Sequence, residues 1–367
     1  MTRSFYQLMC LKYKDESLKY RLLRFILNHS SIEYLNTSFL KAKLVITHPS
    51  FKVCFLNLKE FETTNDYSPN FFKELSKVCV NIQVFRLHCN SANKDNSKLA
   101  KLIEVQNRVK KVYTYKYLSK SGELEKLILK DAISSHDISI VEYHSNGFTE
   151  MDLSILRFQN LVSLHLENYK VNEIDVPEFI KSTSFPNLQE FTIIDFQDFH
   201  RNLFLNISNF IEINGSGLKY LEIGGYSKDI KNLKTLLLSI GRNCEKLESL
   251  TTFYDYNLKH EIGGIFENCI YLREIYLRLI DGKTINADDI FEFMKNARNL
   301  KSIQFGSFIS ISDDSLSVLN ETWLGLKPLL LIYSNYNHHR LGDSPIHILK
   351  NYEKLGLLKY EITGETP

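Results

Sequence analysis

The sequence predicts an α/β solenoid in which short parallel strands alternate with helices along one elongated stack. Two observations predict this fold class. A phrase of the form apolar-x-x-apolar-x-apolar occurs thirteen times, and consecutive copies begin 23 to 30 residues apart. The segments between copies carry apolar residues at helical spacing, for example across residues 229–240. Each repeat then supplies one strand and one helix, and stacked repeats bury what a single repeat cannot.

The repeated phrase marks the strands. Six clear copies begin at Ile82, Leu161, Leu188, Leu218, Leu272 and Leu300. Weaker copies begin at Ile32, Leu58, Val109, Ile138, Leu247, Leu326 and Leu355. The end of the phrase alternates with period two, which is typical of a strand with one buried face. We therefore expect thirteen strands that lie side by side in one parallel sheet.

Helices are expected between the strands, because parallel strands need a crossover connection. Residues 229–240 have one apolar face, and Gly241 is expected to end this helix in a left-handed conformation. Ser68 followed by Pro69 marks a helix start, with serine as the N-cap. Residues 121–132 resemble the strand phrase but lie too close to both neighbouring copies, so we expect a helix there.

The regular spacing predicts a single repeat domain. Residues 17–367 are expected to form one solenoid of about 13 irregular repeats. Residues 1–16 are expected to form an N-terminal capping segment, because the open end of a solenoid needs a cover.

Composition and charge exclude several classes of function. The chain of 367 residues has a formal charge of +2, from 45 basic and 43 acidic side chains. This balance provides no net field toward nucleic acid or anionic lipid. No window of 18 apolar residues occurs, and charged residues interrupt the N-terminal segment before a signal peptide could form. We therefore expect a monomeric cytoplasmic or nuclear protein that binds neither nucleic acid nor membranes.

Cysteines take a recurring place in the repeats. Cys79, Cys244 and Cys269 each lie three residues before a strand phrase, without the paired spacing of a zinc site. The repeat register places all three in buried turns, where a small thiol packs well. Residues 243–250 and 268–275 resemble the cysteine-containing leucine-rich repeat.

This repeat is typical of F-box/leucine-rich-repeat proteins, in which the solenoid holds a substrate and the F-box recruits a cullin ubiquitin ligase. The resemblance implies a horseshoe-shaped solenoid with parallel strands on the concave face and helices on the convex face. It also implies substrate recognition in ubiquitin-dependent degradation, with ubiquitin-ligase machinery as a partner. No F-box is recognised, since residues 17–28 already read as a repeat helix and the first proline is Pro49. A stand-alone scaffold or decoy without ligase recruitment therefore stays open as the alternative.

No motif indicates catalysis or a cofactor. Gly215-Ser216-Gly217 and Gly224-Gly225 lack the continuation of a phosphate-binding loop, and are expected in turns. The adjacent His338 and His339 are expected in a surface loop; a metal-dependent enzyme that uses them is the remote alternative. We expect no catalytic residue, no bound metal and no cofactor, so the chain is not expected to be an enzyme.

The exposed face of the sheet remains as the candidate site. The third, fifth and seventh residues of each phrase point away from the core, where an unknown protein partner is expected to bind. Tyrosine and arginine are prominent among them, and these side chains often dominate protein interfaces. The expected partner-binding residues are Arg86, Lys111, Tyr113, Tyr115, Glu142, Glu190, Tyr220, Glu222, Glu274, Tyr276 and Arg278.

The charges along this face follow a gradient. Arg86, Lys110 and Lys111 form a small basic zone. The rest of the face is acidic, because it carries Glu142, Glu190, Glu222 and Glu274. A partner with the opposite gradient would be steered and aligned by it. The same position rule also places Phe253 on the exposed face.

Overall fold

The computed structural model describes fifteen stretches of the chain and a few further isolated positions. The stretches are 31–37, 42–64, 67–89, 97–116, 139–145, 160–168, 183–196, 203–225, 230–279, 285–286, 288–294, 296–305, 309–310, 329–334 and 358–363. The isolated positions are 21, 317–318, 350 and 353–354. The chain divides into two compact units, residues 1–168 and residues 169–367. Each unit is a stack of repeats in its own right.

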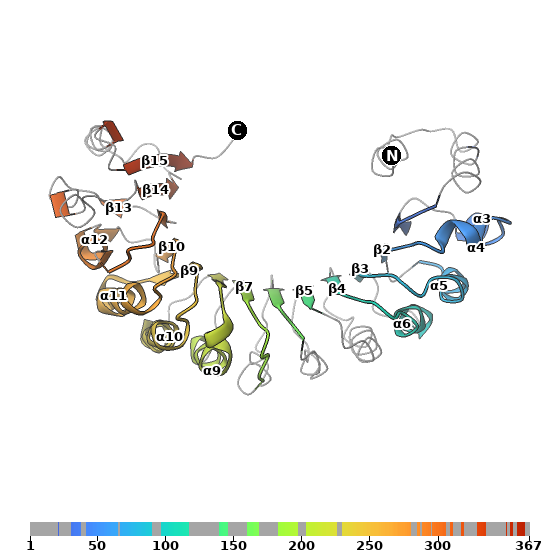
Figure 1. Cartoon of the computed structure of the whole chain (residues 1–367), viewed down its shortest axis with the longest axis horizontal. Helices are drawn as coiled ribbons and strands as arrows, with labels where there is room; N and C mark the ends of the chain where they lie inside the picture. The colour runs from blue at the N-terminus through green and yellow to red at the C-terminus, as the bar shows by residue number, and fades with distance from the viewer. Residues whose placement is uncertain are drawn as a thin grey trace. The chain divides into compact units, whose positions relative to one another are not determined.

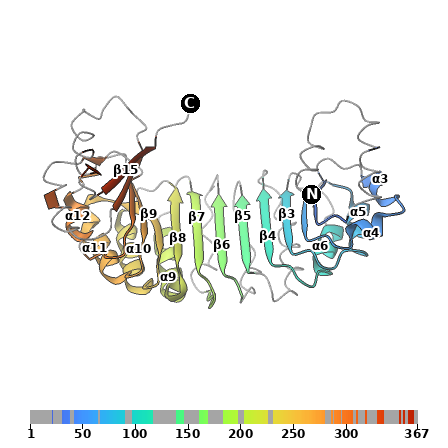
Figure 2. The ribbon, with the colours of Figure 1, turned by 45° about the horizontal axis from the view of Figure 1, so that its top comes forward.

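The described residues of the first unit form six strands that pair in parallel and in chain order, as Figure 2 shows for β3 to β6. The strands are β1 (Tyr34–Asn36), β2 (Glu60–Thr64), β3 (Val84–Cys89), β4 (Lys111–Lys116), β5 (Ile140–Ser145) and β6 (Ser163–Asn168). The described helices are α3 (Ala42–Ile46), α4 (Phe51–Phe55), α5 (Pro69–Leu75) and α6 (Ser97–Glu104).

The described residues of the second unit form seven strands of the main sheet, which are also parallel and in chain order, and a separate pair of two-residue strands. The seven strands are β7 (Glu190–Phe196), β8 (Tyr220–Gly225), β9 (Ser249–Tyr254), β10 (Glu274–Leu279), β12 (Ser302–Phe305), β14 (Leu329–Ser334) and β15 (Leu358–Thr363). The described α-helices are α9 (Leu203–Asn214), α10 (Ile230–Asn243), α11 (Lys259–Asn268) and α12 (Asp288–Met294). Shorter elements are the 3-10 helices η3 (Gly215–Gly217) and η4 (Tyr256–Leu258), and the pair β11 (Ile285–Asn286) and β13 (Ile309–Ser310).

The strands confirm the predicted α/β solenoid of the leucine-rich-repeat type. Each of the thirteen expected strands is present, and the first eleven begin two residues after the start of their phrase. The fourth and sixth residues of the phrase face the core, so that Leu164 and Leu166 are both buried. Within each unit the strands line the inner side and the helices the outer side (Figure 1). The expectation of one solenoid over residues 17–367 stays a prediction, and residues 1–16 lie outside the described residues.

Aromatic side chains join the sheet to the helices in the first unit. The ring of Phe61 on β2 lies 6.0 Å from Phe85 on β3 and 6.3 Å from Phe72 on α5. Both contacts are edge-to-face, an arrangement that aromatic pairs favour. Burial of each phenylalanine contributes roughly 1.5–3 kcal/mol to stability, so this cluster fixes β2 and β3 against their helix.

Buried amide side chains hold the turns that connect helices to strands. Asn214, at the end of α9, accepts a hydrogen bond from Phe185 N (2.6 Å) and donates to Thr183 O (2.8 Å) and Phe210 O (3.0 Å). In the first unit, the Gln106 side chain likewise accepts a hydrogen bond from Ile82 N and donates one to Cys79 O. Both amides therefore satisfy backbone groups of the preceding repeat, which would otherwise be buried without partners.

The three repeat cysteines are buried, as predicted. Cys79, Cys244 and Cys269 are exposed by 1%, 0% and 2%. The Cys79 thiol donates a hydrogen bond to Phe55 O at 3.0 Å, which links two neighbouring repeats. Burial raises the pKa of Cys79 and of Cys269 to about 12. These thiols are therefore protonated at neutral pH and pack as small apolar groups.

The helix ends agree only in part with the sequence. Ser68 precedes Pro69, the first residue of α5, as predicted, although its side chain makes no capping hydrogen bond. The prediction for Gly241 is wrong, because α10 continues through this residue to Asn243. A Cβ at Gly241 would lie 3.5 Å from the backbone of Gly264, so the glycine faces the neighbouring helix α11 rather than ending α10. The helix expected at residues 121–132 lies outside the described residues.

Candidate protein-binding face

Strand register places the polar residues of the first unit in rows across the sheet. Glu62 pairs with Arg86, Arg86 with Tyr113, and Tyr113 with Glu142, each on the next strand. Their side chains point away from the core, because the residues that alternate with them are buried. The row therefore brings Arg86, Tyr113 and Glu142 together on one exposed surface, as the phrase predicts.

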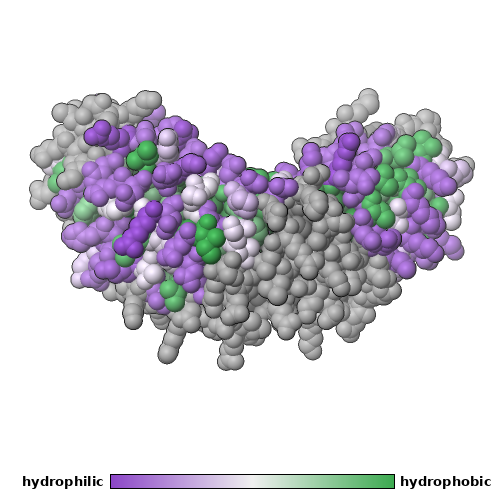
Figure 3. Space-filling model, turned by 60° about the horizontal axis from the view of Figure 1, so that its bottom comes forward, coloured by the Kyte–Doolittle hydropathy of each residue, from purple (hydrophilic) through white to green (hydrophobic). Residues whose placement is uncertain are grey.

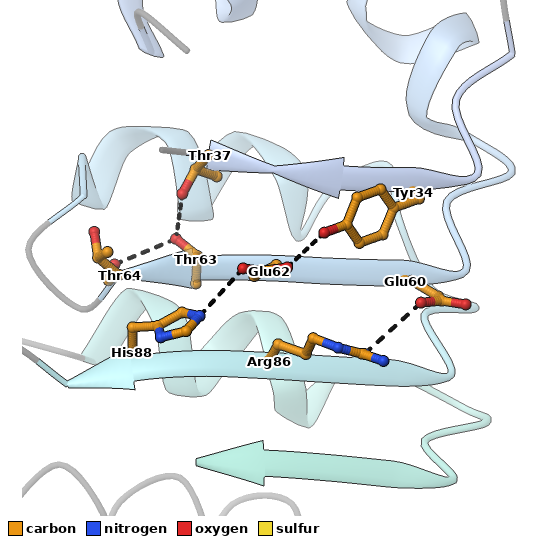
Figure 4. Close-up of polar contacts among 8 residues, drawn as sticks. All are labelled: Tyr34, Thr37, Glu60, Glu62, Thr63, Thr64, Arg86 and His88. Atoms are coloured by element: carbon orange, nitrogen blue, oxygen red, sulfur yellow. Dashed lines mark hydrogen bonds and ion pairs between the residues drawn. The ribbon is translucent and has the colours of Figure 1, made fainter. Parts of the chain in front are cut away.

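Glu62 organises one end of this surface (Figure 4). Tyr34 Oη on β1 donates a hydrogen bond to Glu62 Oε2 at 2.5 Å, and His88 Nε2 on β3 lies 3.2 Å from Glu62 Oε1. The hydrogen bond with His88 lowers the pKa of Glu62, although partial burial opposes this effect. Burial and the bond to Glu62 together raise the pKa of Tyr34 to about 12. One carboxylate thus fixes side chains from both flanking strands.

Arg86 has contacts on two sides. Its Nη1 lies 3.7 Å from Glu60 Oε2, and its guanidinium carbon lies 4.5 Å from the ring centroid of Tyr113. Figure 4 shows the side chain directed along the sheet toward Glu60. Nη1 makes no hydrogen bond within the described residues. The expected basic zone is therefore partly neutralised by a carboxylate on β2.

A second aromatic pair lies one row further along the strands. The His88 and Tyr115 rings are stacked, with centroids 4.7 Å apart and an angle of 13° between planes. Burial raises the pKa of both Tyr113 and Tyr115, and the nearby Glu142 adds to the rise. Both phenols therefore stay neutral and can donate a hydrogen bond to a partner.

The second unit repeats the combination of arginine, tyrosine and glutamate. Arg278 on β10 lies with its Nη2 3.5 Å from Glu222 Oε1 on β8, and its guanidinium carbon is 5.1 Å from the centroid of Tyr276. The ion pair crosses β9, which lies between the two strands. Glu190, Tyr220 and Glu274 are exposed on the same face, and Tyr220 is 47% exposed.

Two sequence-based expectations for this face are wrong. The positions that the structure shows instead explain how Arg278 reaches Glu222. Gly224 lies in strand β8 rather than in a turn, and a Cβ there would meet Arg278 Nη1 at 2.5 Å. Phe253 is buried against Phe204 of α9, with ring centroids 5.6 Å apart, instead of facing outward. Without a side chain at Gly224, and with the phenyl ring turned inward, the guanidinium has room to cross β9.

The structure brings the eleven predicted residues onto the exposed sheet faces of two units. Arg86, Lys111, Tyr113, Tyr115 and Glu142 lie in the first unit. Glu190, Tyr220, Glu222, Glu274, Tyr276 and Arg278 lie in the second unit.

The gradient expected from Arg86 to Glu274 spans both units, and stays a prediction. The sequence-based set omits three residues that organise the first face, namely Tyr34, Glu62 and His88. Each occupies a third, fifth or seventh position of its phrase, so the position rule places Glu62 and His88 on the exposed face, and places Tyr34 there as well.

The outer, helix-covered side of each unit differs from its sheet face. Figure 3 shows it as mainly hydrophilic over the described residues, with smaller hydrophobic groups. Among the described residues, no group of three or more His, Cys, Asp or Glu side chains is placed to hold a metal ion. His338 and His339 lie outside the described residues. Within the described part of the chain, no helix is both long and apolar enough to cross a membrane.

The fold and the site define a solenoid of leucine-rich-repeat type with an exposed, polar and aromatic sheet face. No protein-family model matches the sequence. No curated protein matches it either. A chain in a crystal structure of the yeast Rad7 and Elc1 complex is 13% identical, with a TM-score of 0.48 over all of this chain and 84% of its own length. At this score the similarity assigns neither a family nor a partner.

Proposed function

We propose that this chain is a non-enzymatic protein-interaction module that binds protein on the exposed sheet faces of its two units. The observation that carries the proposal is the pair of arginine brackets, in which Arg86 and Arg278 each lie over a tyrosine and beside a glutamate. Side chains held in place by neighbours lose less conformational entropy when a partner binds. Arginine and tyrosine are also the residues that most often supply binding energy at protein interfaces.

A role in substrate recognition for a ubiquitin ligase is the finer form of this proposal. It is supported by the buried cysteines at the repeat turns, Cys79, Cys244 and Cys269, which the cysteine-containing leucine-rich repeat also has. The alternative is a scaffold or decoy that binds partners without recruiting a ligase. Retention of a purified cullin-ligase adaptor on the immobilised full chain supports the first form, and lack of retention supports the second.

The sheet face is tested by comparing two double variants of the full chain in quantitative affinity purification. Tyr113→Ala with Tyr276→Ala removes one bracket tyrosine from each unit, and we expect partner recovery to fall about tenfold or more. The control, Lys52→Ala with Glu212→Ala, changes exposed residues of α4 and α9 and leaves recovery unchanged. Equal loss of partners in both variants, or in neither, contradicts binding on this face.

A further inference from the structure

The two sheet faces differ in how far their charged groups are already paired. On the first unit, Glu60 and Glu62 contact Arg86 and His88. On the second unit, Glu222 is paired with Arg278. The carboxylates of Glu190 and Glu274 make no ion pair or hydrogen bond with any residue that the structure describes, and both residues are exposed. A partner can therefore gain charge-assisted contacts from these two carboxylates without breaking an existing pair.

The two carboxylates flank an exposed tyrosine in one row of the sheet. Glu190 pairs with Tyr220, Tyr220 with Ser249, and Ser249 with Glu274, on four consecutive strands. Neighbouring strands are about 4.8 Å apart, so the row spans roughly 14 Å from end to end. Tyr220 is 47% exposed. A cation that approaches the row meets a carboxylate and an aromatic ring together.

The basic side chains nearby do not neutralise this row. Arg273 comes before β10, and its Nη1 lies 3.2 Å from Glu248 Oε2, away from Glu274. Lys219 comes directly before β8, and its side chain forms no ion pair with Glu190 or Glu274 among the described residues. The outward positions described for β7 to β10 thus hold three glutamates and one arginine. The arginine, Arg278, is itself paired.

We infer that the sheet face of the second unit binds a partner segment rich in lysine or arginine, through Glu190, Tyr220 and Glu274. Charge complementarity selects this occupant over an acidic one, because an acidic segment would add like charges to two unpaired carboxylates. Arginine and lysine also bind the face of an aromatic ring, which Tyr220 supplies. In an extended segment, residues four apart on one face are about 13 Å apart, which matches the span of the row. This inference rests on the proposed function and specifies its partner.

Selection from a random nonapeptide display library on the immobilised full chain tests the inference. We expect the enriched peptides to contain more lysine and arginine than the unselected library. The same selection against Glu190→Gln with Glu274→Gln should lose this excess. The matched control, Glu212→Gln with Glu292→Gln, removes two exposed carboxylates from α9 and α12 and should keep it.

Affinity of one synthesised, enriched peptide gives the quantitative readout. By fluorescence anisotropy we expect the Kd to rise about tenfold in Glu190→Gln with Glu274→Gln, since two exposed charge pairs are lost. Tyr220→Ala should also weaken binding, and the control pair should change the Kd less than twofold. Circular dichroism of each variant checks that the fold is kept.

The possible failures are distinguishable. Enriched peptides that are neutral or acidic, or that bind the Glu190→Gln and Glu274→Gln variant equally well, overturn the basic-segment inference. If those peptides are lost on Tyr276→Ala, the proposed protein-interaction function stands. Absence of any peptide enriched above a bare surface overturns the inference and also counts against the proposed function.

Discussion

On the first sheet face, the carboxylate of Glu62 holds several neighbouring side chains in position. It holds Tyr34 from β1 and His88 from β3, and the His88 ring in turn stacks on Tyr115 from β4. Four strands are therefore coupled through one side chain. The ionised carboxylate accepts both contacts more strongly than the protonated carboxyl group does, so the strength of the arrangement depends on pH, as the lowered pKa of Glu62 indicates.

The sign of this dependence gives a testable prediction. A carboxyl group with a lowered pKa in the folded state stabilises the protein above its ordinary pKa of about 4.3, and this contribution is lost as the pH falls through the lowered value. We expect Glu62→Gln to destabilise the protein by about 1 kcal/mol at pH 7 in urea unfolding, since its charge-assisted bonds are partly exposed. The difference from the native chain should shrink as the pH is lowered below about 4.

Glu60→Gln on the same strand is the control for this prediction. Glu60 contacts Arg86 only at 3.7 Å, so its replacement should change stability little at any pH. A cost of Glu62→Gln that stays constant from pH 7 to pH 3 would contradict the account of Glu62 as an ionised bridge.

At the scale of elements, the sequence and the structure give Gly241 in helix α10 different roles. The sequence suggests that Gly241 ends the helix in a left-handed conformation, whereas the structure places it inside α10, which ends at Asn243. We predict that Gly241→Ala stabilises the protein by about 0.5–1 kcal/mol, because alanine favours a helix interior. The added Cβ would lie at ordinary contact distance, 3.5 Å from the Gly264 backbone.

The thermal midpoint measures this effect and should rise for Gly241→Ala. Gly224→Ala is the comparison in a strand, where the added Cβ meets Arg278 Nη1 at 2.5 Å and displaces the guanidinium. A fall in the midpoint for Gly241→Ala would show that the residue needs a conformation that alanine resists.

The strands could be predicted from the sequence because their signal is local. Each phrase buries its own fourth and sixth residues, as Leu221 and Ile223 do, so no knowledge of distant residues is needed. The position rule likewise places Tyr220 and Glu274 on the exposed face.

The contacts among these side chains could not be predicted in the same way. The reach of Arg278 to Glu222 depends on Gly224 and on the inward turn of Phe253, residues from three different repeats. Such a contact is set by packing across strands, which periodicity within one repeat does not encode.

On the scale of the whole molecule, each unit is built so that a repeat contacts mainly the repeats next to it. Among the described residues, every strand pairs only with strands of the adjacent repeats, including the short pair β11 and β13. Stability in such a stack is approximately a sum over repeats and their nearest-neighbour interfaces. Local damage should therefore spread over one or two repeats rather than through a complete unit.

Asn214 offers the means to test this locality. Asn214→Ala removes three buried hydrogen bonds and leaves Phe185 N and Thr183 O without their partner, at a cost of about 3 kcal/mol. By hydrogen-exchange mass spectrometry we expect faster exchange in β7, β8 and α10, and little change in β12 and β14. Asn268→Ala is the matched control at the same repeat position, because its exposed amide bonds only Gly264 O within its own helix. If exchange instead rises equally from β7 to β14, the second unit unfolds as one cooperative body, and the nearest-neighbour description does not apply to it.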